Sequence, residues 1–224
     1  MKAVATLILV CSTLTVFSQR TVTKDVGDFD QLKVFDLIEV HLFKSDENKV
    51  VIKGENTDAV KIINENGKLK IRMKLEERFD GSETFVEVHY TDFESLDANE
   101  GAYIVSRAVI SQNTLELKSQ EGGRINVGLD VNYLKAKAVT GGSIQVEGKA
   151  GSQDISLNTG GVFQGRELTT QDTKVSITAA GEADVNATEK VDISIKAGGD
   201  VYVYGNPKEI NKKRFAGGRI KVMN

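Results

Sequence analysis

The stretch Val139-Thr-Gly-Gly-Ser-Ile-Gln-Val146 decides the fold, because from about Leu96 onward it recurs with small changes every 19 or 20 residues. Aligned on the second glycine of each pair, the seven copies are Gly101-Ala-Tyr-Ile-Val, Gly123-Arg-Ile-Asn-Val, Gly142-Ser-Ile-Gln-Val, Gly161-Val-Phe-Gln-Gly, Gly181-Glu-Ala-Asp-Val, Gly199-Asp-Val-Tyr-Val and Gly218-Arg-Ile-Lys-Val. Their spacings are 22, 19, 19, 20, 18 and 19. A fixed period in this range is typical of a solenoid of stacked repeats.

Apolar and polar residues alternate on both sides of each glycine. The residues two and four after it are mostly apolar, as in Tyr103 and Val105 or Ile144 and Val146, and a second alternating run precedes each pair. Successive residues of a strand point to opposite faces, so every second residue faces a core. A propeller blade needs about 40 residues, twice this period. We therefore predict an all-β fold, a right-handed parallel β-helix of coils of ~19–20 residues.

The glycines mark the corners between strands. Glycine tolerates positive φ, and its missing Cβ lets the next coil approach closely. The predicted structural corner glycines are Gly101, Gly123, Gly142, Gly161, Gly181, Gly199 and Gly218.

The segment before the repeats also predicts strands, with less regularity. Residues 31–43 alternate, with a break at Asp36-Leu37, and Asn66-Gly67 between two apolar runs is a hairpin signal. We predict a single domain over 19–224, with an irregular N-terminal β part at about 29–90 and regular repeats at about 96–223.

Composition limits the classes of function. The chain has 224 residues, 40% of them apolar, with 21 glycines, one proline and no tryptophan. This profile suits many short strands with tight corners. The formal net charge is −3 and both signs are interspersed. Nucleic-acid binding relies on clustered basic residues, so no nucleic-acid partner is predicted.

The first 18 residues predict a signal peptide. Lys2 precedes an apolar stretch, and Val16-Phe17-Ser18 offers a cleavage site. Cys11, the single cysteine, raises the alternative of a lipoprotein, but Val10 is a poor residue directly before a lipid-attached cysteine. No later segment is long and apolar enough to span a membrane as a helix. We expect export to the periplasm, the outer-membrane surface or the medium.

An ordered set of segments adds a family resemblance. The carriers are Phe29-Asp-Gln-Leu-Lys-Val34, Ile38-Glu-Val-His-Leu42, Val50-Val-Ile-Lys-Gly54, Gly67-Lys-Leu-Lys-Ile71 and the repeated Gly-Gly or Ala-Gly pairs. Together they resemble the head GIN domain, labelled "putative autotransporter adhesin head", over roughly residues 29–222. The resemblance implies an exported β-helical domain of Gram-negative bacteria, without an assigned activity.

Two classes of function follow. The first is a non-enzymatic envelope or surface module, adhesin-like, that binds a glycan or an envelope or host protein. The alternative is a β-helical polysaccharide lyase or hydrolase, which needs paired carboxylates, often with a cation. We predict no catalytic residue and no cofactor. The oligomeric state is not fixed by the sequence.

Two groups of residues are candidate sites. Glu182, Asp184 and Asp200 lie at outward positions of adjacent coils, where three carboxylates could hold Ca²⁺; the alternative is a solvated face of compensating charges. Tyr202 and Tyr204, with Tyr133 at an earlier corner, are candidates for stacking on a sugar or anchoring a protein partner.

Overall fold

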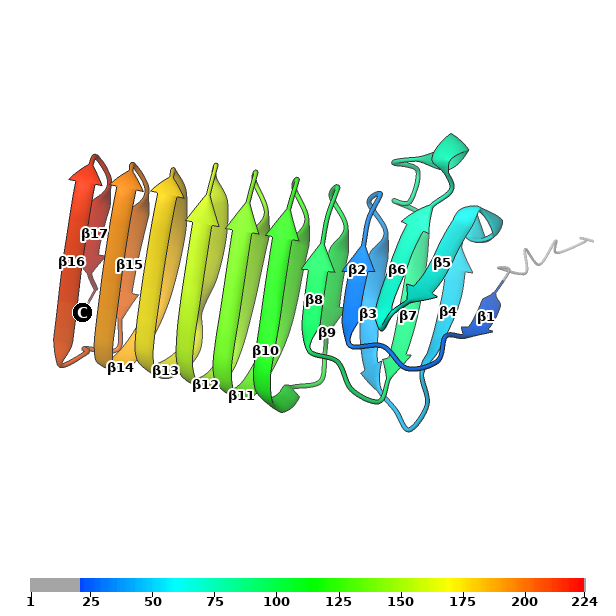
Figure 1. The fold of residues 1–224 in the computed structure, drawn as a ribbon, viewed down its shortest axis with the longest axis horizontal. Coiled ribbons are helices and arrows are strands. Elements are labelled where there is room, and N and C mark those ends of the chain that lie inside the picture. The colour runs from blue at the N-terminus through cyan, green and yellow to red at the C-terminus, as the bar shows by residue number, and fades with distance from the viewer. Residues whose placement is uncertain (1–20, 224) are drawn as a thin grey trace, which may run out of the picture.

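The structure is a computed structural model, and it describes residues 21–223. The predicted signal peptide and Cys11 lie outside the described residues. The chain forms a β-solenoid of about seven turns with a repeat of ~19 residues and an irregular N-terminal part, as predicted. In Figure 1 the near strands run upward and the far strands downward while the chain advances from right to left, which is a right-handed path.

Seventeen strands form one continuous sheet that folds back on itself. The N-terminal elements are β1 (Val22–Asp25), β2 (Gln31–Val34), β3 (Glu39–Lys44), β4 (Lys49–Gly54), the 3-10 turn η1 (Thr57–Ala59), β5 (Val60–Glu65), β6 (Lys68–Met73), the 3-10 turn η2 (Leu75–Glu77) and β7 (Thr84–Tyr90). The repeats contain β8 (Ser95–Ala98), β9 (Tyr103–Ser106), β10 (Ile110–Gln120), β11 (Arg124–Val139), β12 (Ser143–Asn158), β13 (Gly161–Ala179), β14 (Gly181–Ala197), β15 (Asp200–Tyr204), β16 (Glu209–Ala216) and β17 (Arg219–Val222).

Each coil contributes one strand segment to each of two opposed faces. The front face contains β6, β2, β8, β10, the second halves of β11–β14, and β16. The back face contains β7, β3, β9, the first halves of β11–β14, β15 and β17. All of these neighbouring strands pair in parallel. Most of the paired residues are one repeat apart in the sequence, so equivalent residues form columns along the solenoid axis.

Two of these columns form the centre of the core. The front column stacks Leu69, Leu32, Leu96, Leu117, Ala136, Ile155, Val175 and Ile193. The back column stacks Val86, Val40, Ile104, Ile125, Ile144, Phe163, Ala183 and Val201. Every one of these side chains is buried. Burial of each large aliphatic side chain contributes roughly 1.5–3 kcal/mol, so the columns account for much of the stability.

The two glycines of a corner have different roles. Gly141 has φ 71°, and a Cβ on it would meet no atom within 4 Å. Gly142 is outside the positive-φ region, but a Cβ on it would lie 2.2 Å from the carbonyl oxygen of Ser119 in the preceding coil. The first glycine therefore serves backbone conformation, and the second serves close approach between coils.

The alignment of the first copy was wrong by one position. Tyr103 pairs with Arg124, and Ile104 pairs with Ile125. Ile104 is fully buried, whereas Tyr103 and Val105 are half-buried on the outer side. The reason is that this copy has Ala102 in the place of the second glycine, so Gly101 corresponds to Gly122.

The N-terminal part departs from sequence order. The coil made of β2 and β3 lies between the coil of β6 and β7 and the coil of β8 and β9 (Figure 1). The predicted hairpin is present: β5 and β6 pair antiparallel around Asn66 and Gly67, which both have positive φ. Strand β4 pairs antiparallel with β7 and with β1, closing this end of the back face.

Candidate functional site

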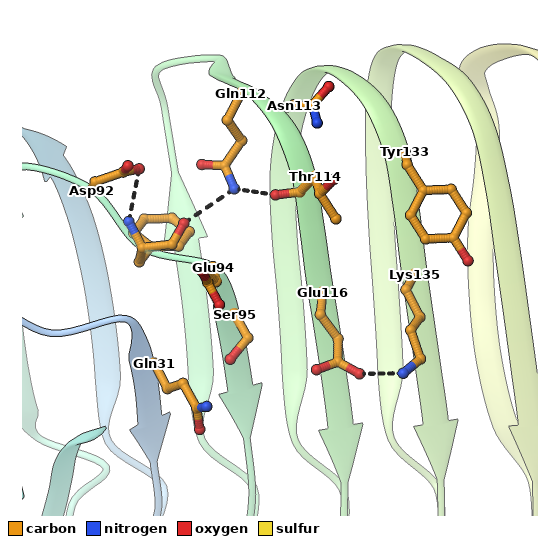
Figure 2. A pocket seen from close by; sticks show the side chains of 11 residues that line it. Gln31, Asp92, Glu94, Ser95, Gln112, Asn113, Thr114, Glu116, Tyr133 and Lys135 are labelled. Carbon is orange, nitrogen blue, oxygen red and sulfur yellow. Dashed lines mark hydrogen bonds and ion pairs between the residues drawn. The ribbon is translucent and has the colours of Figure 1, made fainter. Parts of the chain in front are cut away.

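A groove on the front face lies where the N-terminal part meets the regular repeats (Figure 2). It has a volume of about 530 Å³. We call it the front groove. It is lined by Gln31, Asp92, Phe93, Glu94, Ser95, Gln112, Asn113, Thr114, Glu116, Tyr133 and Lys135.

The groove exists because β8 and β10 begin at different positions along the strand direction. Ser95, the first residue of β8, pairs with Glu116, but β10 begins six residues before Glu116, at Ile110. Over this interval the link between β7 and β8 takes the place of a paired strand. The backbone N–H of Glu116 donates to the carbonyl of Glu94 at 3.0 Å and holds the link against β10.

Gln112 closes one end of the groove. Its Nε2 donates to the carbonyl oxygen of Phe93 at 3.1 Å and to that of Thr114 at 2.6 Å, as the dashed lines in Figure 2 show. These two bonds fix the amide between the link and β10. Phe93 is buried and packs edge-on against Tyr90, with ring centroids 4.6 Å apart. The groove wall is therefore positioned by hydrogen bonds and by the core behind it.

Glu116 is the central charge of the groove. Its carboxylate lies 2.5 Å from Lys118 Nζ and 2.9 Å from Lys135 Nζ. Partial burial opposes ionisation, but the hydrogen bonds from the two lysines outweigh it and hold the pKa of Glu116 below its usual value. The same contact raises the pKa of Lys135. These shifts favour the charged forms of Glu116 and Lys135, and the carboxylate is compensated.

Tyr133 borders the groove on the side of the later repeats (Figure 2). It follows Thr114 and precedes Ser152 in one outward column, and its side chain is 37% exposed. An exposed aromatic ring beside amides, hydroxyls and a compensated ion pair offers a stacking surface together with hydrogen-bond donors and acceptors. This combination suits a polyhydroxylated ligand.

The three candidate calcium ligands lie on the back face, away from the front groove. Glu182 pairs in register with Asp200, and Asp184 pairs with Tyr202. Asp200 accepts two hydrogen bonds from the Arg219 guanidinium, at 3.0 and 2.5 Å. Burial raises the pKa of Asp184, and the nearby Glu182 raises it further. Within residues 21–223 no three His, Cys, Asp or Glu side chains are grouped so that they could hold a metal ion.

The candidate tyrosines Tyr202 and Tyr204 also lie on the back face, and both are half-buried. Lys221 Nζ lies 5.6 Å from the ring centroid of Tyr202, and Arg166 Cζ lies 4.8 Å from that of Tyr204. Cations therefore already occupy positions over both rings. The structure does not bring these tyrosines together with the carboxylates into a hollow.

Sequence reasoning did not find the front groove. The groove depends on the starting points of β8 and β10, which no motif marks. One feature of the sequence distinguishes Tyr133: a large aromatic residue occupies the position that Ser152 has in the next coil.

The chain belongs to the head GIN domain family. A family model described as "Putative auto-transporter adhesin, head GIN domain" matches residues 28–207. This agrees with the resemblance found in the sequence. No curated protein matches the chain.

Solved structures share the fold at low sequence identity. A "putative adhesin" from Bacteroides fragilis is similar with a TM-score of 0.84 and 15% identity, over 92% of this chain and 98% of that one. A "putative lipid binding protein" from Parabacteroides distasonis has a TM-score of 0.72 and 16% identity, over 93% and 98%. A "putative adhesin" from Parabacteroides merdae has a TM-score of 0.63 and 16% identity, over 93% and 98%. Within residues 21–223, no helix has the length and apolar character needed to cross a membrane.

Proposed function

We propose that this protein is a non-enzymatic binding module of the cell envelope or surface, and that it binds a glycan in the front groove. The observation that carries the proposal is the placement of Tyr133 beside Gln112 and the Glu116–Lys135 ion pair. Sugar rings present one apolar face and many hydroxyls, which an exposed aromatic ring and fixed polar groups complement.

The charge state of Glu116 supports binding over hydrolysis. A glycosidase needs one carboxylic acid with a raised pKa that protonates the leaving oxygen. In the front groove Glu116 has two lysine partners and a lowered pKa. It is a hydrogen-bond acceptor for a ligand and a poor proton donor.

The predicted export supports the same role. Residues 1–18 have the pattern of a signal peptide, and the family is described as "Putative auto-transporter adhesin, head GIN domain". Protease accessibility on intact and lysed cells tests the location. Digestion on intact cells supports a surface adhesin, whereas protection until lysis supports a periplasmic module.

Binding is tested with the purified mature protein on a glycan array, followed by titration calorimetry of each glycan that binds. We expect Tyr133→Ala to weaken binding at least tenfold. Tyr202→Ala, which removes a half-buried tyrosine from the back face, is the control and is expected to leave the affinity unchanged. Binding that survives Tyr133→Ala, or that is lost in the control, contradicts the proposed site.

A further inference from the structure

The front groove continues along the solenoid. A second hollow of about 310 Å³ shares Tyr133 with the front groove, and a third of about 430 Å³ shares Lys174 and Asp192 with the second. All three open on the front face. We call the joined depression the axial trough; it runs from β8 to β16.

The trough follows from the columns of the front face. Ser156, Ser176 and Ser194 stack in register in one outward column. The next outward column carries longer side chains, among them Asp154 and Lys174. Over these three coils a row of small side chains beside a row of longer ones leaves a depression parallel to the axis; the serine column ends at Lys137 on one side and at Lys213 on the other. Its direction is therefore set by the repeat itself.

The charges along the trough alternate in sign. Glu116, Lys135, Asp154, Lys174 and Asp192 occupy one column in five successive coils. Lys135 Nζ lies 2.9 Å from Glu116, and Lys174 Nζ lies 3.1 Å from Asp154. The Asn211 amide donates to Asp192 at 2.9 Å. Within this column the charges compensate one another, and each ion pair still presents hydrogen-bond donors and acceptors.

We propose that the axial trough binds a linear, uncharged glycan whose chain runs parallel to the solenoid axis. This inference rests on the proposed function and extends it from one groove to a series of subsites. Seven front-face strands from β8 to β16 at about 4.8 Å each span roughly 29 Å, long enough for several sugar units. Compensated ion pairs contact hydroxyl groups without requiring an opposite charge on the ligand.

An extended polypeptide fits the trough less well. Peptides bind sheets through an unpaired strand edge or through apolar anchor pockets. Strands β11 to β14 are paired on both sides, and β10 is paired with β8 from Glu116 onward, with the link between β7 and β8 beside its first residues. Among the described residues that line the trough, Tyr133 is the one exposed aromatic side chain.

The test compares ligand lengths on the full mature protein. The probes are linear β-1,3-, β-1,4- and α-1,4-linked gluco-oligosaccharides of two and of seven units, titrated by calorimetry. In at least one series we expect the seven-unit chain to bind ten times more tightly than the two-unit chain. The charge-neutral double variant Lys174→Ala/Asp192→Ala is expected to reduce the affinity for the seven-unit chain at least fivefold and to leave the two-unit chain unaffected.

The matched control removes a charge-neutral pair from the back face, Asp200→Ala/Arg219→Ala, and is expected to leave both affinities unchanged. Equal affinity for short and long chains, or tighter binding of dextran sulfate than of dextran, overturns the inference. If short chains still bind in a manner that depends on Tyr133, the proposed function stands without the trough. If no glycan binds at all, both are wrong.

Discussion

Asp36 and Glu100 adjoin at the upper corners of two neighbouring coils, and each has one buried carboxyl oxygen without a hydrogen-bond donor. Asp36 is fully buried in the turn between β2 and β3, and its burial raises its pKa. The backbone N–H of Met73, at 3.0 Å, opposes this rise, whereas Glu100 adds to it. A hydrogen bond between two carboxyl groups requires a proton on one of them. Asp36 therefore keeps a proton, shared with Glu100 through this hydrogen bond, to a higher pH than a free aspartate does.

Asp36→Asn tests this shared proton. Because the pKa of Asp36 is raised on folding, its effect on stability is most favourable below the unfolded pKa and is lost as the pH rises through the folded pKa. An amide at this position imitates the protonated acid at every pH. We expect the variant to be about 1 kcal/mol more stable than the wild type at pH 7 and equal to it near pH 3, measured by urea unfolding.

Asp36→Ala provides the contrast, since it removes the acceptor of the Met73 N–H as well as the charge. It is expected to destabilise the protein by about 1–3 kcal/mol at both pH values. If Asp36→Asn is as destabilising at pH 7 as Asp36→Ala, the carboxylate is ionised and held by Arg72 and Arg78, whose Nε atoms lie 3.9 and 3.7 Å away.

Glu116→Gln is expected to show the opposite pH dependence. The pKa of Glu116 is lowered on folding, so its stabilisation is present above the unfolded pKa of about 4.5 and is lost as the pH falls through the folded pKa. The variant should be about 1 kcal/mol less stable than the wild type at pH 7, with the difference gone at pH 2–3. Glu147→Gln, at an exposed position on β12, is the control; a similar loss there would assign the effect to general charge.

The two glycines of one corner provide a third prediction. Gly142→Ala places a Cβ against the Ser119 carbonyl, so the coils must separate, and we expect a loss of 3 kcal/mol or more, on the order of a severely overpacked core. Gly141→Ala meets no neighbour and costs only the backbone strain at φ 71°, about 1 kcal/mol. Thermal unfolding of both variants checks the order, and the reverse order would refute the two roles.

The register of the first repeat is tested by neighbouring substitutions. Ile104→Ala empties a position of the back core column and is expected to cost about 2–5 kcal/mol. Tyr103→Ala removes an outer side chain that stacks with Arg124 and should cost 1 kcal/mol or less. Equal losses in denaturant unfolding would contradict the register.

The regular part of the fold could be predicted because period and parity are local properties of the sequence. The buried pairs Ile144/Val146 and Ile155/Leu157 were assigned correctly to the core from alternation alone. The first copy failed because Ala102 replaced the glycine on which the copies were aligned. One substitution at a corner shifts the apparent parity of a whole strand.

Two features have no local signature. Nothing in residues 31–44 indicates that their coil lies between two coils formed later in the chain, because that order depends on long-range pairing. The front groove likewise depends on a pairing between Ser95 and Glu116. Among the outward acidic residues named from sequence, Asp200 is neutralised across coils by Arg219, which is the alternative of compensating charges.

The offset stacking of the front-face columns has an evolutionary consequence. Each central coil contacts mainly the coil before it and the coil after it, so duplication or deletion of one complete repeat after β11, within β12 to β14, leaves the residues of the front groove in place. Such an event lengthens or shortens the solenoid by about 4.8 Å. Tandem duplication thus adjusts the reach of the molecule in fixed increments, while the N-terminal coils, interleaved out of chain order, cannot be copied one at a time.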